Sequence, residues 1–385
     1  MANIMDYLDW RGDLTMEADG FNEVDNLILA QLVYVDFEGI VPPPKQGDIY
    51  LKEASDLFWQ RHTKKEILSH VSMTKSAPFL MRKLAESRRF RGAKLSAYIN
   101  DISDEEQSQF SVVCVRLADG SLYVAFSGTD NTIVGWRENF NMGFLSETPG
   151  QKKAVKYLNW AAANEEGTLR VGGHSKGGNL AVYAAVKCDA AIKEKIVHVY
   201  SNDGPGFSRD VVESDEYQQM LPKISTILPE SSIVGMLLEH QEKYEVVKST
   251  ERGVGQHDAM SWEVLGPSFC YVEHLAAESL LLDETMKNFI EQLDNEERRQ
   301  LINAVFTLLE EAEIRTVDDF YNSKWKKIQE LVKAQSKLPE ETQKIFSKAL
   351  RSLWNSGNDT IRRSVKQAMR EHRGEAQEPL LGKKE

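Results

Sequence analysis

Hydrophobic positions near the start of the chain recur at a helical period. Val24, Leu27, Ile28 and Leu32 repeat at spacings of three and four residues, and Asn22 stands before them. Asparagine is a favoured N-cap residue, because its side chain accepts hydrogen bonds from the first amides of a helix. The pattern therefore predicts an amphipathic helix that packs on a core.

The pattern changes to strands after residue 90. Lys94 to Ile99, Phe110 to Arg116 and Leu122 to Phe126 are rich in β-branched and aromatic residues, and Ala118-Asp-Gly separates the last two. A short turn between two such segments predicts a hairpin.

Strands and helices then alternate. We expect helices at residues 150–163 and 177–187, and strands at 168–172, 196–201, 224–228 and 244–247. Alternation of this kind is typical of an α/β protein with a mostly parallel central sheet that helices cover on both faces.

Beyond about Leu282 only the helical period remains, with helix starts expected at Thr316 and Pro339. We therefore divide the chain into an α/β domain at 1–281, which includes an N-terminal helical segment at 1–90, a helical module at 282–373 and a polar tail at 374–385.

Composition narrows the functional classes. Hydrophobic residues make up 41% of the 385 residues, which is enough for a sizeable core, and the formal charge of −12 argues against a nucleic-acid partner. The three cysteines are far apart and no Cys/His spacing predicts a metal site, so no metal or cofactor is expected. Residues 1–10 lack a basic leader, and the apolar run at 27–35 is too short to span a bilayer. We expect a cytoplasmic protein.

The segment Gly173-His-Ser-Lys-Gly177 matches the G-x-S-x-G pattern of a nucleophile elbow. A predicted buried strand precedes it, and a helix rich in small residues follows. This context predicts an α/β-hydrolase fold with Ser175 as the nucleophile. His174 adjoins the serine and is expected to point elsewhere.

A serine hydroxyl needs a base that takes its proton. His257 follows the strand at 244–247 and a glycine-containing loop, which is where the chain order Ser, acid, His of this fold places the base. A surface or helix-capping role is the alternative for His257.

Two carboxylates compete for the role of the acid. Asp203 follows the strand at 196–201 and begins a tight Asp-Gly-Pro-Gly turn, whereas Glu230 follows the strand at 224–228. We favour Asp203 and keep Glu230 as the alternative. Asp203 could also serve only to cap its own turn.

The oxyanion of an acyl-transfer reaction needs two backbone donors, one of which comes from the residue after the nucleophile. Lys176 has that position. For the second donor we favour Thr129, in the strand end Phe126-Ser-Gly-Thr-Asp130.

These motifs resemble known families. Phe126-Ser-Gly-Thr-Asp130 together with the elbow is similar to the class 3 (fungal-type) lipases, over roughly Leu95 to Trp262. Asn202-Asp-Gly-Pro-Gly-Phe207, Gln256-His-Asp258 and Met5-Asp-Tyr-Leu-Asp-Trp10 more closely resemble the bacterial Mbeg-like α/β hydrolases, over most of the chain. The lipase resemblance implies Ser175 as nucleophile, His257 as base, and Thr129 and Lys176 as oxyanion donors. It also implies an acid after the strand at 224–228, where this chain has Pro229-Glu-Ser-Ser instead of an aspartate.

The favoured hypothesis is a serine hydrolase, of esterase, lipase or thioesterase type, that acts on a small acyl-containing substrate, with a lipid among the candidates. An apolar stretch separates the strand end at Phe126 to Asp130 from the elbow, and it could form a lid over an acyl group or could be core. Its members are Ile133, Val134, Trp136, Phe140, Met142, Phe144 and Leu145. The alternative is a catalytically silent scaffold that binds a protein partner or a membrane surface through its C-terminal helices. A basic amphipathic helix around residues 361–373 motivates that alternative.

Overall fold

A computed structural model describes residues 1–69, 74–103, 105–106, 108–129, 142, 147–277, 279–281, 284–285, 288, 292, 295–311 and 343–344. Its centre is a nine-stranded sheet in the order β1-β2-β3-β4-β5-β6-β7-β8-β11. The protein is a mixed α/β fold. The strands of this sheet are β1 (Asp48–Tyr50), β2 (Lys94–Ser103), β3 (Ser108–Arg116), β4 (Leu122–Phe126), β5 (Leu169–His174), β6 (Ile196–Asn202), β7 (Ile224–Pro229), β8 (Tyr244–Val247) and β11 (Tyr271–Val272).

The sheet is less parallel than the sequence pattern predicts. Each strand from β4 to β8 is parallel to the next. On one side of this centre, β1 pairs with β2, β2 with β3 and β3 with β4, all antiparallel. On the other side, β11 pairs antiparallel with β8. The expectation of a mostly parallel sheet is therefore correct only for the centre. Short turns such as that at 117–121 can join only antiparallel neighbours, which is why the first edge of the sheet is a meander.

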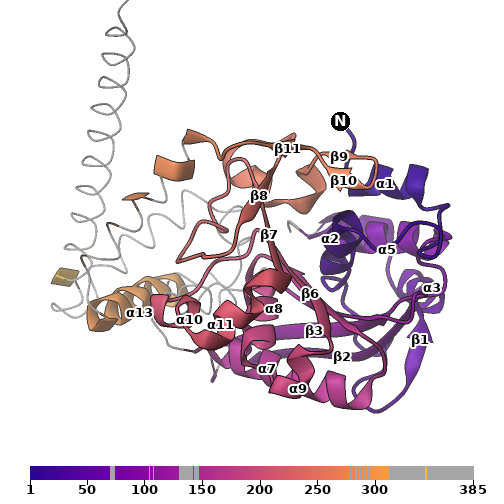
Figure 1. Cartoon of the computed structure of the whole chain (residues 1–385), viewed down its shortest axis with the longest axis horizontal. Coiled ribbons are helices and arrows are strands. Elements are labelled where there is room, and N and C mark those ends of the chain that lie inside the picture. The colour runs from indigo at the N-terminus through magenta and orange to yellow at the C-terminus, as the bar shows by residue number, and fades with distance from the viewer. Residues whose placement is uncertain are drawn as a thin grey trace, which may run out of the picture.

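Helices cover both faces of the sheet (Figure 1). On one face α2 (Glu23–Leu32) contacts β4, β5 and β6, and α1 (Ile4–Arg11) and α5 (Ala77–Glu86) pack against α2. On the other face α7 (Pro149–Asn164) contacts β3, and α8 (Lys176–Lys187) contacts β4, β5 and β6. The remaining described elements are α3 (Leu51–Arg61), α4 (Lys64–Ser69), α9 (Ala190–Lys193), α10 (Arg209–Val212), α11 (Asp215–Met220), α13 (Asn295–Glu311), the 3₁₀ turns at Leu221–Lys223, Gly253–His257 and Ala259–Ser261, and the hairpin of β9 (Val264–Leu265) and β10 (Ser268–Phe269).

The alternation of side chains along the strands divides the core in two. Val113 and Val115 of β3 point into the cluster under the N-terminal helices, whereas Val112 and Cys114 point into the cluster under α7 and α8. Successive side chains of a strand lie on opposite faces, so a strand buried on both sides contributes to both clusters.

The N-terminal helices are fixed by polar contacts as well as by packing. Asn22 caps α2 in a capping box with Asp25, which confirms the predicted start of this helix. The buried guanidinium of Arg89 binds the buried carboxylate of Asp25, with 2.7 Å from Nε to Oδ1. This ion pair connects α2 to the loop that leads into β2.

Several predictions concern residues outside the described part of the chain. These are the helix starts at Thr316 and Pro339, the basic helix around 361–373, the polar tail and most of the expected lid, of which only Met142 is described, as a buried residue. None of the described helices is long and apolar enough to cross a membrane.

Candidate active site

The ends of two neighbouring parallel strands bring Ser175 and Asp203 together. The register of β5 with β6 pairs His174 with Asn202, so the next residue of each strand leaves the sheet at the same edge. The backbone amide of Ser175 donates to the carbonyl of Asn202 at 2.9 Å and so fixes the two strand ends. In α/β sheets the carboxyl ends of parallel strands are the usual place for ligands.

Ser175 has the backbone of a sharp turn between a strand and a helix. Its φ is 59° and its ψ is −133°, and it is the N-cap of α8. A positive φ is unfavourable for a residue with a Cβ, and such strain is concentrated at functional sites. The side chain projects from the turn at the edge of the sheet.

The glycines of the G-x-S-x-G segment are required by backbone contacts. A Cβ on Gly173 would lie 2.3 Å from the carbonyl carbon of Gly177, and a Cβ on Gly177 would lie 2.1 Å from the carbonyl oxygen of Phe126. Because these neighbours are main-chain atoms, no side-chain movement could make room for a methyl group.

His257 reaches Ser175 from the 3₁₀ turn that follows β8. Its Nε2 lies 2.9 Å from Oγ of Ser175, and its Nδ1 lies 2.6 Å from Oδ2 of Asp203. The carboxylate can only accept, so Nδ1 carries the proton and Nε2 is left to accept the serine hydroxyl. The neighbouring carbonyl of Gln256 accepts a hydrogen bond from the indole of Trp262 at 2.8 Å, which helps to fix this turn.

The carboxylate of Asp203 is fully buried and remains ionised. Burial would raise its pKa, but the hydrogen bond and charge of His257, with a further hydrogen bond from Ser232, outweigh burial and hold the pKa below its ordinary value. Ser232 donates its hydroxyl to Oδ1, and the amide of Gly235 donates to the same oxygen at 3.1 Å. A negative charge therefore faces the imidazole.

The alternative acid has a different position. Glu230 follows β7, where its amide donates to the carbonyl of Val247 at 3.0 Å. The ring nitrogen that Glu230 would have to contact already donates to Asp203. Of the two carboxylates, the structure brings Asp203 to His257.

The two expected oxyanion donors lie at the start of α8 and after β4. Lys176 begins α8, so its amide belongs to the first turn, where backbone N–H groups point out of the helix. Phe126 at the end of β4 pairs with Gly173 of β5, and the chain from Ser127 to Thr129 continues beside the elbow. A Cβ on Gly128 would lie 3.1 Å from Cβ of Ser175, which shows how closely this segment approaches.

The sequence patterns did not identify two residues that hydrogen-bond to the residues around the site, Asn202 and Ser232. Asn202 accepts a hydrogen bond from Asn26 of α2 at 2.9 Å and donates to the carbonyl of Gly173 at 2.9 Å. Ser232 was noted only as a serine in place of an expected aspartate. Polar residues within a few positions of a strand end are the signal that could have suggested both roles.

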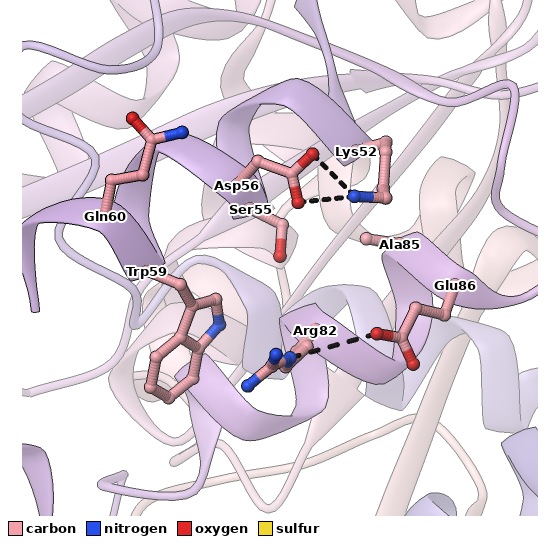
Figure 2. A pocket seen from close by; sticks show the side chains of 8 residues that line it. All are labelled: Lys52, Ser55, Asp56, Trp59, Gln60, Arg82, Ala85 and Glu86. Carbon is pink, nitrogen blue, oxygen red and sulfur yellow. Dashed lines mark hydrogen bonds and ion pairs between the residues drawn. The ribbon is translucent and has the colours of Figure 1, made fainter. Parts of the chain in front are cut away.

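A hollow lies on the surface between α3 and α5 (Figure 2). Its charged side chains pair with one another: Lys52 with Asp56, and Arg82 with Glu86 at 3.8 Å. The guanidinium of Arg82 also lies 5.3 Å from the ring centroid of Trp59. Ser55 carries the one hydroxyl among the described residues that line the hollow, and no histidine is among them, so these residues do not repeat the serine–histidine arrangement of the site at Ser175.

In the described part of the chain, no group of three or more His, Cys, Asp or Glu side chains is arranged to hold an ion. Cys114 and Cys188 are buried free thiols and Cys270 is partly buried.

Comparison with known proteins identifies the family. Among solved structures, the M37 lipase is 17% identical with a TM-score of 0.33, and the Rhizomucor miehei lipase in its propeptide complex is 12% identical with a TM-score of 0.27. Each match covers 46% of this chain and 70% of the other. No curated protein matches the chain. The profile of the Mbeg1-like family matches residues 84–307, which is more than half of the 385 residues. The chain belongs to the Mbeg1-like family.

Proposed function

We propose that this protein is a serine hydrolase of the α/β-hydrolase fold that cleaves a carboxylic ester or thioester through an acyl-enzyme on Ser175. One observation carries the proposal: Oγ of Ser175, the imidazole of His257 and the carboxylate of Asp203 form a continuous hydrogen-bonded chain. A hydroxyl, a base and an acid in this order are the arrangement that activates serine for attack on a carbonyl carbon.

The reaction takes place in two halves. Nε2 of His257 takes the proton of Ser175 as Oγ attacks the carbonyl carbon, and the imidazolium then gives that proton to the departing alcohol or thiol. In the second half, His257 takes a proton from water as the water oxygen attacks the acyl carbon. The bond between Oγ and the acyl carbon then breaks, the imidazolium returns its proton to Oγ, and the carboxylic acid leaves. The negative charge of Asp203 stabilises the imidazolium in both halves.

The amides of Lys176 and Thr129 are the proposed donors to the oxyanion of the tetrahedral intermediate. Two features support them: Lys176 directly follows Ser175 at the start of α8, and Thr129 follows β4, whose last residue Phe126 pairs with Gly173. Donors that are fixed before the reaction need no rearrangement when the charge develops.

Labelling with a fluorophosphonate probe tests the proposal, because such a probe forms a stable bond only to an activated serine. We expect the wild type to be labelled and Ser175→Ala and His257→Ala to be unlabelled. Ser225→Ala and His198→Ala are matched controls, since these two residues bond to each other at 2.8 Å in the first halves of β6 and β7. Both controls should label as the wild type does.

A panel of esters and thioesters with acyl chains of increasing length then identifies the substrate class, with Ser175→Ala as the blank. A folded wild type that neither reacts with the probe nor hydrolyses any member of the panel would contradict the proposal.

A further inference from the structure

The side chain of His174 lies between the base and the N-terminal segment. Its Nε2 lies 2.8 Å from the backbone carbonyl oxygen of His257, and its Nδ1 lies 3.2 Å from the hydroxyl of Tyr34. The centroids of the His174 and His257 rings are 4.6 Å apart. His174 therefore contacts both the backbone carbonyl and the ring of His257.

The protonation of His174 follows from its partners. A carbonyl oxygen can only accept, so Nε2 carries the proton and Nδ1 accepts from Tyr34. Burial, together with the neighbouring His257, lowers the pKa of His174 to about 3. The ring is neutral under ordinary conditions, and the direction of this hydrogen-bonded chain is fixed.

Tyr34 also packs against Gly128, in the segment after β4 that carries Thr129. A Cβ on Gly128 would lie 2.1 Å from the hydroxyl of Tyr34, and the same hydroxyl lies 3.3 Å from the carbonyl oxygen of His174. Burial raises the pKa of Tyr34, so the phenol keeps its proton. Tyr34 follows α2 and precedes residues 84–307, the part of the chain that the family profile matches.

His257 has to satisfy two partners at the same time. Its ring contacts Ser175 at 2.9 Å and Asp203 at 2.6 Å, yet it comes from a short 3₁₀ turn and not from a strand or a long helix. A displacement of about 1 Å in a catalytic group can cost roughly a hundredfold in rate. The carbonyl that His174 binds belongs to His257 itself, so this contact fixes the backbone from which the imidazole ring projects.

We propose that His174 and Tyr34 are positioning residues for the catalytic base, and that through them the N-terminal segment controls the geometry of the active site. The inference rests on the proposed function, in which His257 is the base. It adds that a segment outside the family-matched region belongs to the machinery of the site.

Three variants separate positioning from simple packing. The side-chain amide nitrogen of glutamine can occupy the place of Nε2, so His174→Gln keeps the bond to His257, whereas His174→Leu fills a similar space without it. We expect His174→Leu to lower the rate of fluorophosphonate labelling by about tenfold to a hundredfold, and His174→Gln to stay within about threefold of the wild type. Tyr34→Phe should lower the labelling rate by about threefold to tenfold, because the Tyr34 hydroxyl acts on His257 only through its hydrogen bond to His174.

Tyr7→Phe is the matched control. Tyr7 is another buried tyrosine of the N-terminal segment, and its hydroxyl donates to Asp25 at 3.0 Å, which is a contact that does not lead to His257. This variant should lower stability but leave the labelling rate per folded molecule unchanged.

A readout that does not require activity completes the test. The proton between Nδ1 of His257 and Asp203 lies in a short hydrogen bond and should give a far-downfield proton resonance in the wild type. We expect His174→Leu to broaden or abolish this resonance, and His174→Gln and Tyr7→Phe to retain it. If His174→Leu keeps both the resonance and the labelling rate, the inference is wrong. If the wild type is not labelled at all, the proposed function fails, and the resonance alone then decides the inference.

Discussion

Ser232 donates its hydroxyl to Oδ1 of Asp203, the carboxylate oxygen that does not face His257. Ser232 lies after β7, at the strand end where the lipase resemblance implies the acid itself. The carboxylate that contacts His257 instead belongs to Asp203, at the end of β6, and the amide of Asp203 donates to the carbonyl of Ile227 in β7 at 2.8 Å. Ser232, in the loop after β7, therefore stabilises through a hydrogen bond the carboxylate of Asp203, which follows the neighbouring strand β6.

The choice between the two candidate acids can be measured directly. We expect Asp203→Asn to lower the labelling or hydrolysis rate on the order of 10⁴-fold, because the amide can no longer stabilise the imidazolium. Glu230→Gln should have little effect, since its side chain would have to displace Asp203 from Nδ1 of His257. The assignment would be reversed if Glu230→Gln lost its labelling or hydrolysis rate while Asp203→Asn kept the rate of the wild type.

Ser232→Ala tests the support of the acid. Removing the hydroxyl deprives the buried carboxylate of one of its donors, so the carboxylate should hold the imidazolium less well and the labelling rate should fall by about tenfold. Ser231→Ala is the neighbouring control, because Ser231 contacts Gln256 through its backbone amide at 2.7 Å, which alanine retains. Equal rates in the two variants would show that the Ser232 hydroxyl is dispensable.

His174 should make the stability depend on pH. Burial lowers its pKa from 6.5 to about 3, so between these values the unfolded chain binds a proton that the folded protein does not. This contribution to stability is complete above the unfolded value and is lost as the pH falls from about 6.5 towards 3, at up to ~1.4 kcal/mol per pH unit. Urea unfolding of the wild type and of His174→Gln from about pH 7 to about pH 4 isolates the effect, because all other groups titrate in both proteins. Parallel curves for the two proteins would contradict it.

The ion pair between Arg89 and Asp25 should matter far more than the pairs on the surface. Both side chains are fully buried, so Arg89→Met leaves an uncompensated carboxylate and should lower the free energy of unfolding by about 3–5 kcal/mol. Arg82→Met is the control: Arg82 pairs with Glu86 at the surface (Figure 2), with 61% and 65% of the two side chains exposed, and its loss should cost less than ~1 kcal/mol. Similar losses in urea unfolding would show that burial is not what makes the Arg89 pair matter.

The sequence predicts the elements well where local chemistry dominates. The capping box at Asn22 and the hairpin of β3 and β4 follow from hydrogen bonds and turns between residues close in the chain. The positions of Gly173 and Ser175 also follow from the sharp local turn from strand to helix, whereas Gly177 is required by the close approach of Phe126 in β4. The antiparallel pairings of β1 with β2 and of β11 with β8 were harder to predict, since they join residues farther apart in the chain.

By itself the sequence determined the elbow at Ser175 and narrowed the base and the acid to a few strand ends. Only the tertiary structure decided that His257 lies between Ser175 and Asp203, 82 and 54 positions away along the chain. It also brought Ser232, His174 and Tyr34 to the same place. The physical reason is that a hydrogen bond requires atoms within about 3 Å, and such distances between remote residues depend on strand order and register, which no local pattern encodes.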